Sequence, residues 1–421
     1  MNRLTKLTVV ALSLVVFSYA SLGYVLRKTD DEKSYRSLTV YGEVLQRIQE
    51  EYVEEPNMAK VTAGALHGLL ESLDSMSSYL SPQEYTEYKK QVTARTQGQT
   101  GIALSKGGGY IRVVSTLPDS PAEKAGLLTG DILESIGGFA TREMSVGQAM
   151  NLIDGPPGST VKVSVIRPSR GLTPEEVTVT RLGITQPHVT MTKLAPDIVY
   201  LRIPAMEKGV AEEVRTKLVD ADRQGLRKAV LDFRGCALGD DAEGIAVARL
   251  FLASGAIATL KGQMVTKQDF AADPSKVVWK NPVSILVSNA TSGAAELVAT
   301  GIISNHRGDV VGERTYGTAS EQKLIEFDDG SAVFLTDAFY YTPEGKAIPE
   351  DGVTPTTPVP LTSDDAVSFS RAENPPAIPA APADDAVLSK ALDLLNNAHK
   401  VAERHVPNNP RRVHAQWPIQ A

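Results

Sequence analysis

The chain has 421 residues, of which 42% are hydrophobic and 22% are charged, which is enough for two or three domains with buried cores. This composition excludes a chain that is disordered throughout. The 43 basic and 50 acidic side chains give a formal charge of −7. No nucleic-acid partner is expected, because no Lys/Arg stripe is interleaved with aromatic residues. Cys236 is the only cysteine, which excludes an internal disulfide and a cysteine-rich zinc site.

Residues 1–35 predict a short cytoplasmic tip and a membrane anchor. Arg3 and Lys6 precede an apolar run over residues 7–26, and about twenty such residues can span a bilayer. The two cations favour a cytoplasmic N-terminus, with the bulk of the chain outside the cytoplasm. The alternatives are a cleaved signal peptide, for which the small residues ending at Ala20 give a poor site, and a buried helix of a soluble protein.

The composition and the hydrophobic pattern change several times along the rest of the chain. Residues 36–96 have apolar side chains at mostly helical spacing and predict a helical region. Residues 97–183 consist of short strand-like runs separated by Gly and Pro, with one helix around "SVGQAMNLI", and predict a compact β-rich domain. Residues 361–384 are a Pro/Ala linker, and residues 385–421 comprise an amphipathic helix, capped by one of the two aspartates at its start, and a tail.

Residues 184–360 alternate strands with helices. The helices are expected over 209–224, 244–252 and 294–303, each between two short apolar strands. Alternation of this kind predicts an α/β layer around a largely parallel sheet.

Residues 97–181 resemble a PDZ domain of the bacterial, circularly permuted type. The resemblance rests on "TGIAL" and on "SPAEKAGLLTGDILESIGG", which matches almost position for position. Backbone N–H groups in such a loop receive a peptide's terminal carboxylate, and the adjacent strand edge adds the peptide as an extra strand. The resemblance places Gly101, Ile102, Ala103 and Leu104 in that loop and implies binding of peptide or protein C-termini. The alternative is a β-rich module that only packs on its neighbour.

Residues 41–359 as a whole resemble the carboxyl-terminal processing proteases, which are tail-specific serine peptidases with an inserted PDZ domain. The motifs "YGEVLQRIQEEYVEEP", "GALHGLLESLD", "VGERTYGTASEQ" and "YYTPEGKAIPEDGVTPTTPV" occur in the family's order. The resemblance implies a multidomain α+β and α/β fold, with a ClpP/crotonase-like protease core, an inserted PDZ domain and an N-terminal transmembrane helix. It also implies a single-pass protein of the bacterial inner membrane, with its bulk in the periplasm.

Members of that family cut peptides with a serine that a neutral lysine amine activates. The serine lies three residues before a glutamate, which is Glu296 here, so the nucleophile position is Gly293. The lysine position is Thr318, whose hydroxyl cannot accept a proton near neutral pH as an amine can. The family's orienting glutamine is kept as Gln322.

The turn that offers a backbone N–H to the oxyanion departs from the family's "NNPGG" and reads "GCALGDD". Leu238 stands at the first glycine and Gly239 at the second. Asp240 and Asp241 bring negative charge close to the oxyanion. Three altered elements together predict a pseudoprotease that binds C-termini without hydrolysis.

Two other functions stay open. One is an active serine endopeptidase that uses Ser292 or another nucleophile, with a base from elsewhere such as Lys323. The other is an adaptor subunit for an active protease paralogue, or a homo-oligomer, with the C-terminal helix as docking element. The expectation for Ser292 is structural: Thr291 or Ser292 is expected to cap the helix that begins at Gly293.

No cofactor and no metal are expected. The six histidines are scattered, and His306, which follows the helix after Gly293, is expected to be a solvated loop residue. The acidic cluster of Asp240, Asp241 and Glu243 is expected to be an exposed turn. Cys236 is expected to be buried and inert.

Overall fold

The computed structural model describes residues 38–93, 99–107, 109–142, 144–168, 170–184, 187–349, 351–360 and 385–404. The chain forms two compact units, Met1–Ala65 and Leu66–Ala421. The expected anchor at residues 7–26, the linker over 361–384 and the tail beyond residue 404 lie outside the described residues. Among the helices that are described, none is both long and apolar enough to cross a bilayer.

The predicted helical region contains three helices and one unexpected strand. A helix over residues 38–51 lies in the first unit, and α2 (Met58–Glu71) and α3 (Pro82–Thr93) follow. Ser81 and Glu84 cap α3 reciprocally, since the Ser81 N–H donates to the Glu84 carboxylate at 2.7 Å. The strand β1 (Ser78–Leu80) has only three residues, too few to show an alternating pattern in the sequence.

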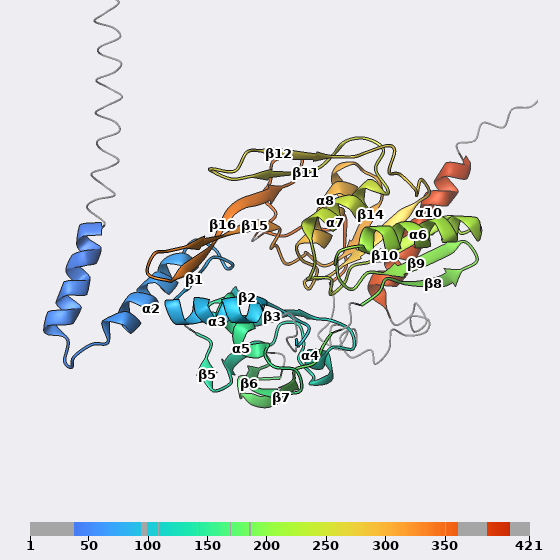
Figure 1. Ribbon diagram of the computed structural model, residues 1–421. Coiled ribbons are helices and arrows are strands. Elements are labelled where there is room, and N and C mark those ends of the chain that lie inside the picture. The colour runs from blue at the N-terminus through green and yellow to red at the C-terminus, as the bar shows by residue number, and fades with distance from the viewer. Residues whose placement is uncertain are drawn as a thin grey trace, which may run out of the picture. The chain divides into compact units, whose positions relative to one another are not determined.

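The β-rich region forms an antiparallel sheet with β2 at one edge, in the order β2-β3-β4-β6-β7, with β5 paired to β4 (Figure 1). Its strands are β2 (Ile102–Gly107), β3 (Tyr110–Thr116), β4 (Ile132–Ile136), β5 (Phe139–Ala140), β6 (Thr160–Ile166) and β7 (Glu175–Thr180). The helices α4 (Pro121–Lys124) and α5 (Val146–Ile153) complete this region. Ser145 and Gln148 form a capping box at the start of α5, which explains why the predicted helix begins there.

The region after it contains the predicted, largely parallel sheet, in the order β17-β14-β13-β10-β9-β8. Every neighbouring pair is parallel except β8 with β9. The strands are β8 (Thr190–Ala195), β9 (Ile198–Arg202), β10 (Lys228–Asp232), β13 (Val283–Val287), β14 (Asp309–Gly312) and β17 (Thr357–Pro358).

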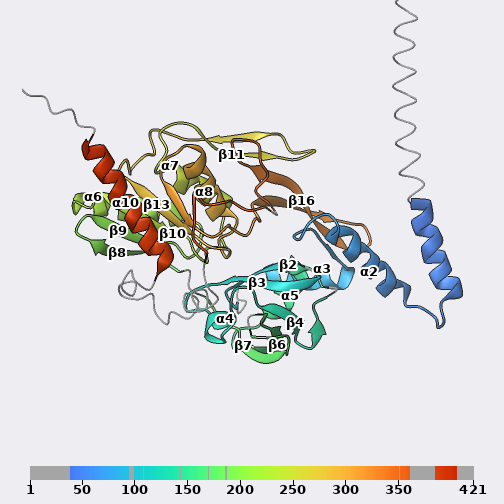
Figure 2. The ribbon, with the colours of Figure 1, turned by 180° about the vertical axis from the view of Figure 1, so that it is seen from behind.

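Helices cover both faces of this sheet. One face, with Leu201 and Leu231, packs against α6 (Val210–Arg223), α7 (Asp241–Arg249) and α8 (Ala294–Ser304). The other face, with Tyr200 and Val230, packs against α10 (Ala386–Arg404), which crosses the sheet in Figure 2. Neighbouring residues of one strand thus pack into two cores on opposite faces of the sheet, because successive side chains of a strand point to opposite faces.

Two expectations about helices need correction. The helix α7 begins at Asp241, three residues earlier than expected, because the Asp240 side chain caps it by accepting a hydrogen bond from the Ala242 N–H at 2.8 Å. The adaptor alternative used the C-terminal helix α10 as a docking element for a partner. Its apolar residues pack on the sheet of its own chain instead, so that face is occupied.

A second, antiparallel sheet was not anticipated. It has the order β1-β16-β11-β12, and β15 pairs with β16. Its strands besides β1 are β11 (Ala256–Lys261), β12 (Gln268–Ala271), β15 (Ser320–Glu326) and β16 (Ala332–Tyr341). Since β15 begins two residues after Thr318, this sheet helps to fix one side of the candidate site.

Candidate active site and peptide-binding groove

Gly293 lies at a sharp turn between β13 and α8. Its backbone angles are φ 57° and ψ −122°, a region that strains any residue with a Cβ. A Cβ added there would have only one atom within 4 Å, the Thr318 Oγ1 at 3.9 Å. The structure therefore brings the expected nucleophile position, Gly293, and the expected base position, Thr318, face to face.

The Glu296 carboxylate holds this arrangement together. It is fully buried in the first turn of α8 and accepts hydrogen bonds from the N–H groups of Gly293, Gly317 and Thr318 at 2.9, 2.7 and 3.0 Å, and from the Thr315 hydroxyl. Burial raises the pKa of Glu296, and these hydrogen bonds oppose the rise. In the sequence analysis, Glu296 served only to locate the nucleophile position. A glutamate at the third position of a helix is a signal for such a role.

The expected helix cap by Thr291 or Ser292 is wrong. The Thr291 hydroxyl donates to the Phe233 carbonyl at 2.8 Å and accepts from the Ser288 N–H at 2.9 Å. The Ser292 hydroxyl contacts the Thr318 hydroxyl, with 2.5 Å between the two oxygens. Neither side chain caps α8, because the residue at its N-cap is Gly293, which has no side chain, while the Glu296 carboxylate accepts the Gly293 N–H.

Ser292 is nevertheless poorly placed to attack a substrate. Only 4% of the residue is exposed, and its hydroxyl faces another hydroxyl rather than a base. Its N–H donates to the Cys236 carbonyl at 2.9 Å, which ties it to the turn that follows β10.

The turn after β10 contains Gly239, which the sequence places at the family's second glycine. Gly239 has φ 136°, and an added Cβ would lie 2.3 Å from the Met206 backbone, so only glycine fits. Met206 bridges the turn by donating to the Leu238 carbonyl at 2.7 Å and accepting from the Asp240 N–H at 2.8 Å. The Gly239 N–H has no acceptor among the described residues. A potential oxyanion donor therefore remains, although Leu238 replaces the other glycine.

The acidic residues beyond the turn have separate roles. Asp240 is exposed and caps α7. The Glu243 carboxylate accepts the N–H groups of Gly209 and Ala211 at 2.9 and 2.8 Å and so satisfies the start of α6. Within the described residues, no group of three or more His, Cys, Asp or Glu side chains is placed to hold a metal ion.

Asp241 is an acidic residue of this cluster whose pKa is strongly raised. Burial first, and then neighbouring carboxylates, raise its pKa to about 7. Those carboxylates belong to Glu321, Asp240 and Glu296. The Glu321 carboxylate accepts a hydrogen bond from the Tyr340 hydroxyl at 3.2 Å, and burial followed by these charges raises the pKa of Tyr340. The site is thus strongly electronegative.

The other predicted residues lie apart from this centre. The Gln322 amide donates to the Met76 carbonyl at 2.8 Å, so it is engaged outside the Gly293 and Thr318 pair. Lys323 is exposed on β15. His306 is an exposed residue after α8, with φ 49°. Cys236 is 1% exposed, and burial raises the pKa of its thiol, as an inert cysteine requires.

Of the four residues of the expected carboxylate-binding loop, only Gly101 lies in the turn before the edge strand, because Ile102, Ala103 and Leu104 belong to β2 itself. Gly101 has φ 72°, and an added Cβ would lie 2.4 Å from the Ser120 Cβ, so only glycine fits. The Thr100 N–H donates to the half-buried Asp154 carboxylate at 3.1 Å, whereas the Gly101 N–H finds no acceptor in the described part of the chain.

The side chains of Ile102, Ala103 and Leu104 are at most 8% exposed. Ile102 and Leu104 share a core with Ala149 and Ile153 of α5. The helix α5 and the edge strand β2 therefore pack against one core, and the free Gly101 N–H lies at the start of that strand.

Comparisons with known proteins agree with this architecture. Residues 197–359 match the model of peptidase family S41, and residues 112–167 match that of a PDZ domain. The carboxy-terminal-processing protease of Bartonella bacilliformis is 28% identical over 351 residues, which are 81% of this chain and 80% of the relative. The carboxy-terminal processing protease CtpA of Bacillus subtilis is 28% identical over 355 residues, covering 84% and 74% of the two chains.

Among solved structures, the photosystem II D1 C-terminal processing protease superposes with a TM-score of 0.63 and 24% identity. The superposition covers 81% of this chain and 98% of that one. It shows a common fold for the sheet, its helices and the β-rich insertion. With a peptidase family S41 domain and a PDZ domain in one chain, the protein is a homologue of the carboxyl-terminal processing proteases.

Proposed function

We propose that the protein binds peptide or protein C-termini in its PDZ groove and does not hydrolyse them. The observation that carries the proposal is the pairing of Gly293 with Thr318, where the relatives have a serine and a lysine. A glycine offers no nucleophile, and a threonine hydroxyl is no base near neutral pH. The acidic surroundings of Asp241 also disfavour a developing oxyanion.

The groove supports the binding half of the proposal. An edge strand with one unpaired side can add a peptide as a further strand, and the unengaged Gly101 N–H is a donor for a terminal carboxylate. Replacing the peptide's carboxylate by an amide is expected to weaken binding by about 1.5–3 kcal/mol, the cost of losing hydrogen bonds to a charged group. Equal affinity for the acid and the amide would remove this half of the proposal.

A protease assay tests the other half. The purified protein is incubated with an unfolded, fluorescently labelled protein, beside an active serine peptidase as positive control. We expect no release of fragments and no change with Ser292→Ala.

An active endopeptidase built on Ser292 remains the second candidate, because the Ser292 and Thr318 hydroxyls touch. Cleavage by the unchanged protein, abolished by Ser292→Ala, would establish this candidate and overturn the first. Cleavage that survives Ser292→Ala would point to another nucleophile and would equally contradict a binding-only role.

We further propose that residues 7–26 hold the protein in the inner membrane, with its bulk in the periplasm. The support is the apolar run after Arg3 and Lys6. The protein is expected in the membrane fraction, with residues after Thr39 accessible to protease added to spheroplasts. A mature N-terminus near Ser21 in a freely soluble protein would contradict an uncleaved anchor.

A further inference from the structure

Asp154 lies beside the turn that leads into the edge strand β2. It follows the last residue of α5, and its carboxylate accepts hydrogen bonds from the Thr100 N–H and the Thr100 hydroxyl, both at 3.1 Å. Thr100 is fully buried and directly precedes Gly101. A negative charge of the protein itself therefore lies next to the donor that the proposed function assigns to a peptide's terminal carboxylate.

The two carboxylates would be close enough to repel each other. Consecutive backbone nitrogens are at most about 4 Å apart, so an oxygen that accepts the Gly101 N–H lies within roughly 10 Å of the Asp154 carboxylate. Repulsion between like charges at that distance, partly shielded by solvent, changes a binding constant about fivefold. A peptide amide carries no charge at its end and escapes this repulsion.

Arg181 is the cation that compensates Asp154. Its guanidinium donates to the carbonyl groups of Leu152 and Ile153 in the last turn of α5, at 2.6 and 2.9 Å, and its charge favours the ionised form of Asp154. The C-terminus of a helix by itself disfavours a carboxylate. The carboxylate of a bound peptide would add a second anion beside this cation, and a proton taken up by Asp154 would restore the balance of charge.

The protonation of Asp154 is therefore linked to peptide binding. Burial raises the pKa of Asp154 above its ordinary value of 3.8, while the hydrogen bonds from Thr100 and the charge of Arg181 oppose that rise. A neighbouring anion raises the pKa of a carboxyl group further. The bound carboxylate and the Asp154 proton thus stabilise each other, and the affinity for free C-termini must increase as the pH falls through the pKa of Asp154.

The helix α4 brings further charges to the same turn. One of its N–H groups donates to the Thr100 carbonyl at 2.9 Å, and it carries Glu123 and Lys124, with Asp119 just before it. Burial also raises the pKa of Glu123. The Glu123 carboxylate accepts the Asp119 N–H at 2.6 Å, whereas the Asp154 carboxylate bonds to the turn itself.

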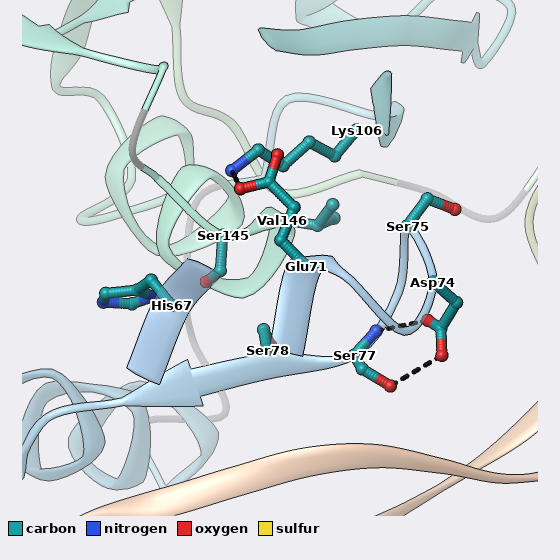
Figure 3. Close-up of a pocket in the computed structure, with 9 residues that line it drawn as sticks. All are labelled: His67, Glu71, Asp74, Ser75, Ser77, Ser78, Lys106, Ser145 and Val146. Atoms are coloured by element: carbon teal, nitrogen blue, oxygen red, sulfur yellow. Dashed lines mark hydrogen bonds and ion pairs between the residues drawn. The ribbon is translucent and has the colours of Figure 1, made fainter. Parts of the chain in front are cut away.

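A histidine lies at the other end of the strand. His67 lines a small hollow together with Lys106, near the end of β2 (Figure 3). Its Nε2 is 3.9 Å from the Glu84 carboxylate, and the Lys106 ammonium is 2.9 Å from the Glu71 carboxylate. Lys106 lies five residues after Gly101, roughly 16 Å along an extended strand. Since histidine is the usual source of pH dependence between about pH 5 and 8, His67 has to be tested as a control.

We propose that Asp154 is a specificity-determining residue that opposes the binding of free C-termini while it is ionised, so that the PDZ domain binds them more tightly as the pH falls. The inference rests on the proposed binding of C-termini. It goes beyond that proposal because it makes recognition of the terminal carboxylate depend on one proton.

The test uses the full-length protein and neutral hexapeptides that end in Ala, Val or Leu, each as the free acid and as the amide. Asp154→Asn keeps an acceptor for Thr100 and removes the charge. At pH 8 this variant should bind the acids about fivefold more tightly than the unchanged protein does, and the amides within about twofold. The matched control is Glu176→Gln, an exposed carboxylate of β7 that pairs with Lys162, which should change neither affinity.

The pH profile of the unchanged protein tests the proposal without that substitution, in case Asp154→Asn fails to fold. From pH 8 to pH 5 the affinity for the acids should increase at least about twofold, and the affinity for the amides should stay level. His67→Gln and Glu123→Gln should keep this increase, and Asp154→Asn should remove it.

A flat profile, or an increase that survives Asp154→Asn or disappears in His67→Gln or Glu123→Gln, would overturn the role of Asp154. An acid-to-amide ratio that Asp154→Asn leaves unchanged would overturn it too, while C-terminus binding would stand. Equal binding of acids and amides by both the unchanged protein and Asp154→Asn would overturn the proposed C-terminus binding, and this inference with it.

Discussion

Asp385, at the start of the C-terminal helix α10, accepts two hydrogen bonds from Arg234, at 2.9 and 2.8 Å, although 151 residues separate them. Arg234 belongs to the turn after β10 and is 4% exposed, and its guanidinium also contacts Asp232, which is fully buried. The Tyr200 hydroxyl donates to Asp232 at 2.6 Å. One buried arginine thus joins the C-terminal helix to the turn that holds Gly239.

The first prediction concerns this connection. Asp385→Asn keeps a cap for α10 but removes the charge that faces Arg234, so the free energy of unfolding should fall by about 2–3 kcal/mol. The matched control is Asp393→Asn, an exposed position of the same helix, which should change it by less than about 0.5 kcal/mol. Urea unfolding measures both, and equal stabilities would show that the pair contributes nothing.

The second prediction is a dependence of stability on pH that Asp241 causes. Its pKa in the folded protein is about 7, above the ordinary value of 3.8, so the native state keeps a proton that the unfolded chain has released. Its contribution to stability must therefore fall as pH rises from about 4 to about 7, and stay level above that.

Asp241→Asn removes this titration without removing the side chain. At pH 8 the variant should be more stable than the unchanged protein, by an amount on the order of 2 kcal/mol, and the gain should vanish near pH 4. Urea unfolding at several pH values measures the difference. A gain that is the same at every pH would contradict the assigned pKa.

Patterns of local spacing predicted much of the fold. The alternation along β6, and the apolar runs of β10 and β13, are visible in the sequence because burial on one or both faces leaves a period. The second sheet was missed because β1 has three residues and β12 has four, and because β1 pairs with β16, which lies far away in the chain. Strands this short contain too few residues to show an alternation of apolar and polar side chains.

The sequence predicted the positions of the candidate site but not the contacts between its side chains. Aligned motifs placed Gly293 and Thr318, and the structure brings these two positions together. The roles of Ser292 and Glu296 could not be read in this way, because which side chain caps α8 depends on a loop that arrives 19 residues later, at Thr315. Asp385 was expected only as a helix cap, since its partner Arg234 is 151 residues away.

The third prediction concerns Cys236. Its thiol is buried beneath the turn, and burial raises its pKa, so little reactive thiolate forms at neutral pH. The native protein should react with a thiol reagent such as Ellman's reagent only as slowly as it unfolds, and at once in denaturant. Rapid labelling of the native protein would contradict an inert cysteine.

The fourth prediction separates backbone strain from lack of space at Gly293. An added methyl group meets no close atom, but the backbone angles disfavour a Cβ, so Gly293→Ala should cost about 1–3 kcal/mol of unfolding free energy. The matched control is Gly147→Ala in α5, where the nearest atom to an added Cβ is 3.8 Å away and φ is not positive. That change should stabilise the protein by about 0.5–1 kcal/mol. Opposite signs measured by urea unfolding would support strain, and equal signs would contradict it.

The fifth prediction introduces a serine and a lysine at the two positions where the family resemblance expects them. Gly293→Ser with Thr318→Lys places a hydroxyl and an amine face to face, yet we expect little proteolysis from this double variant. The new lysine would lie beside Glu296, and close to the acidic group around Asp241, and these charges favour the ammonium over the neutral amine that must act as base. Adding Asp241→Asn should therefore raise the rate and lower the pH at which activity appears.

The oxyanion turn sets the second limit on that variant. The Gly239 N–H is available, but the turn departs from the family's pattern at Leu238, and an oxyanion donor that is not aimed at the oxyanion costs about a hundred- to thousandfold in rate. Leu238→Gly in the restored background should recover part of that factor, measured as release of fragments from an unfolded protein, with the same changes on a Gly293→Ala background as the inactive control. Full activity of the double variant alone would show that neither the acidic surroundings nor the altered turn limits catalysis. The proposed lack of proteolysis would then be due to Gly293 and Thr318 alone.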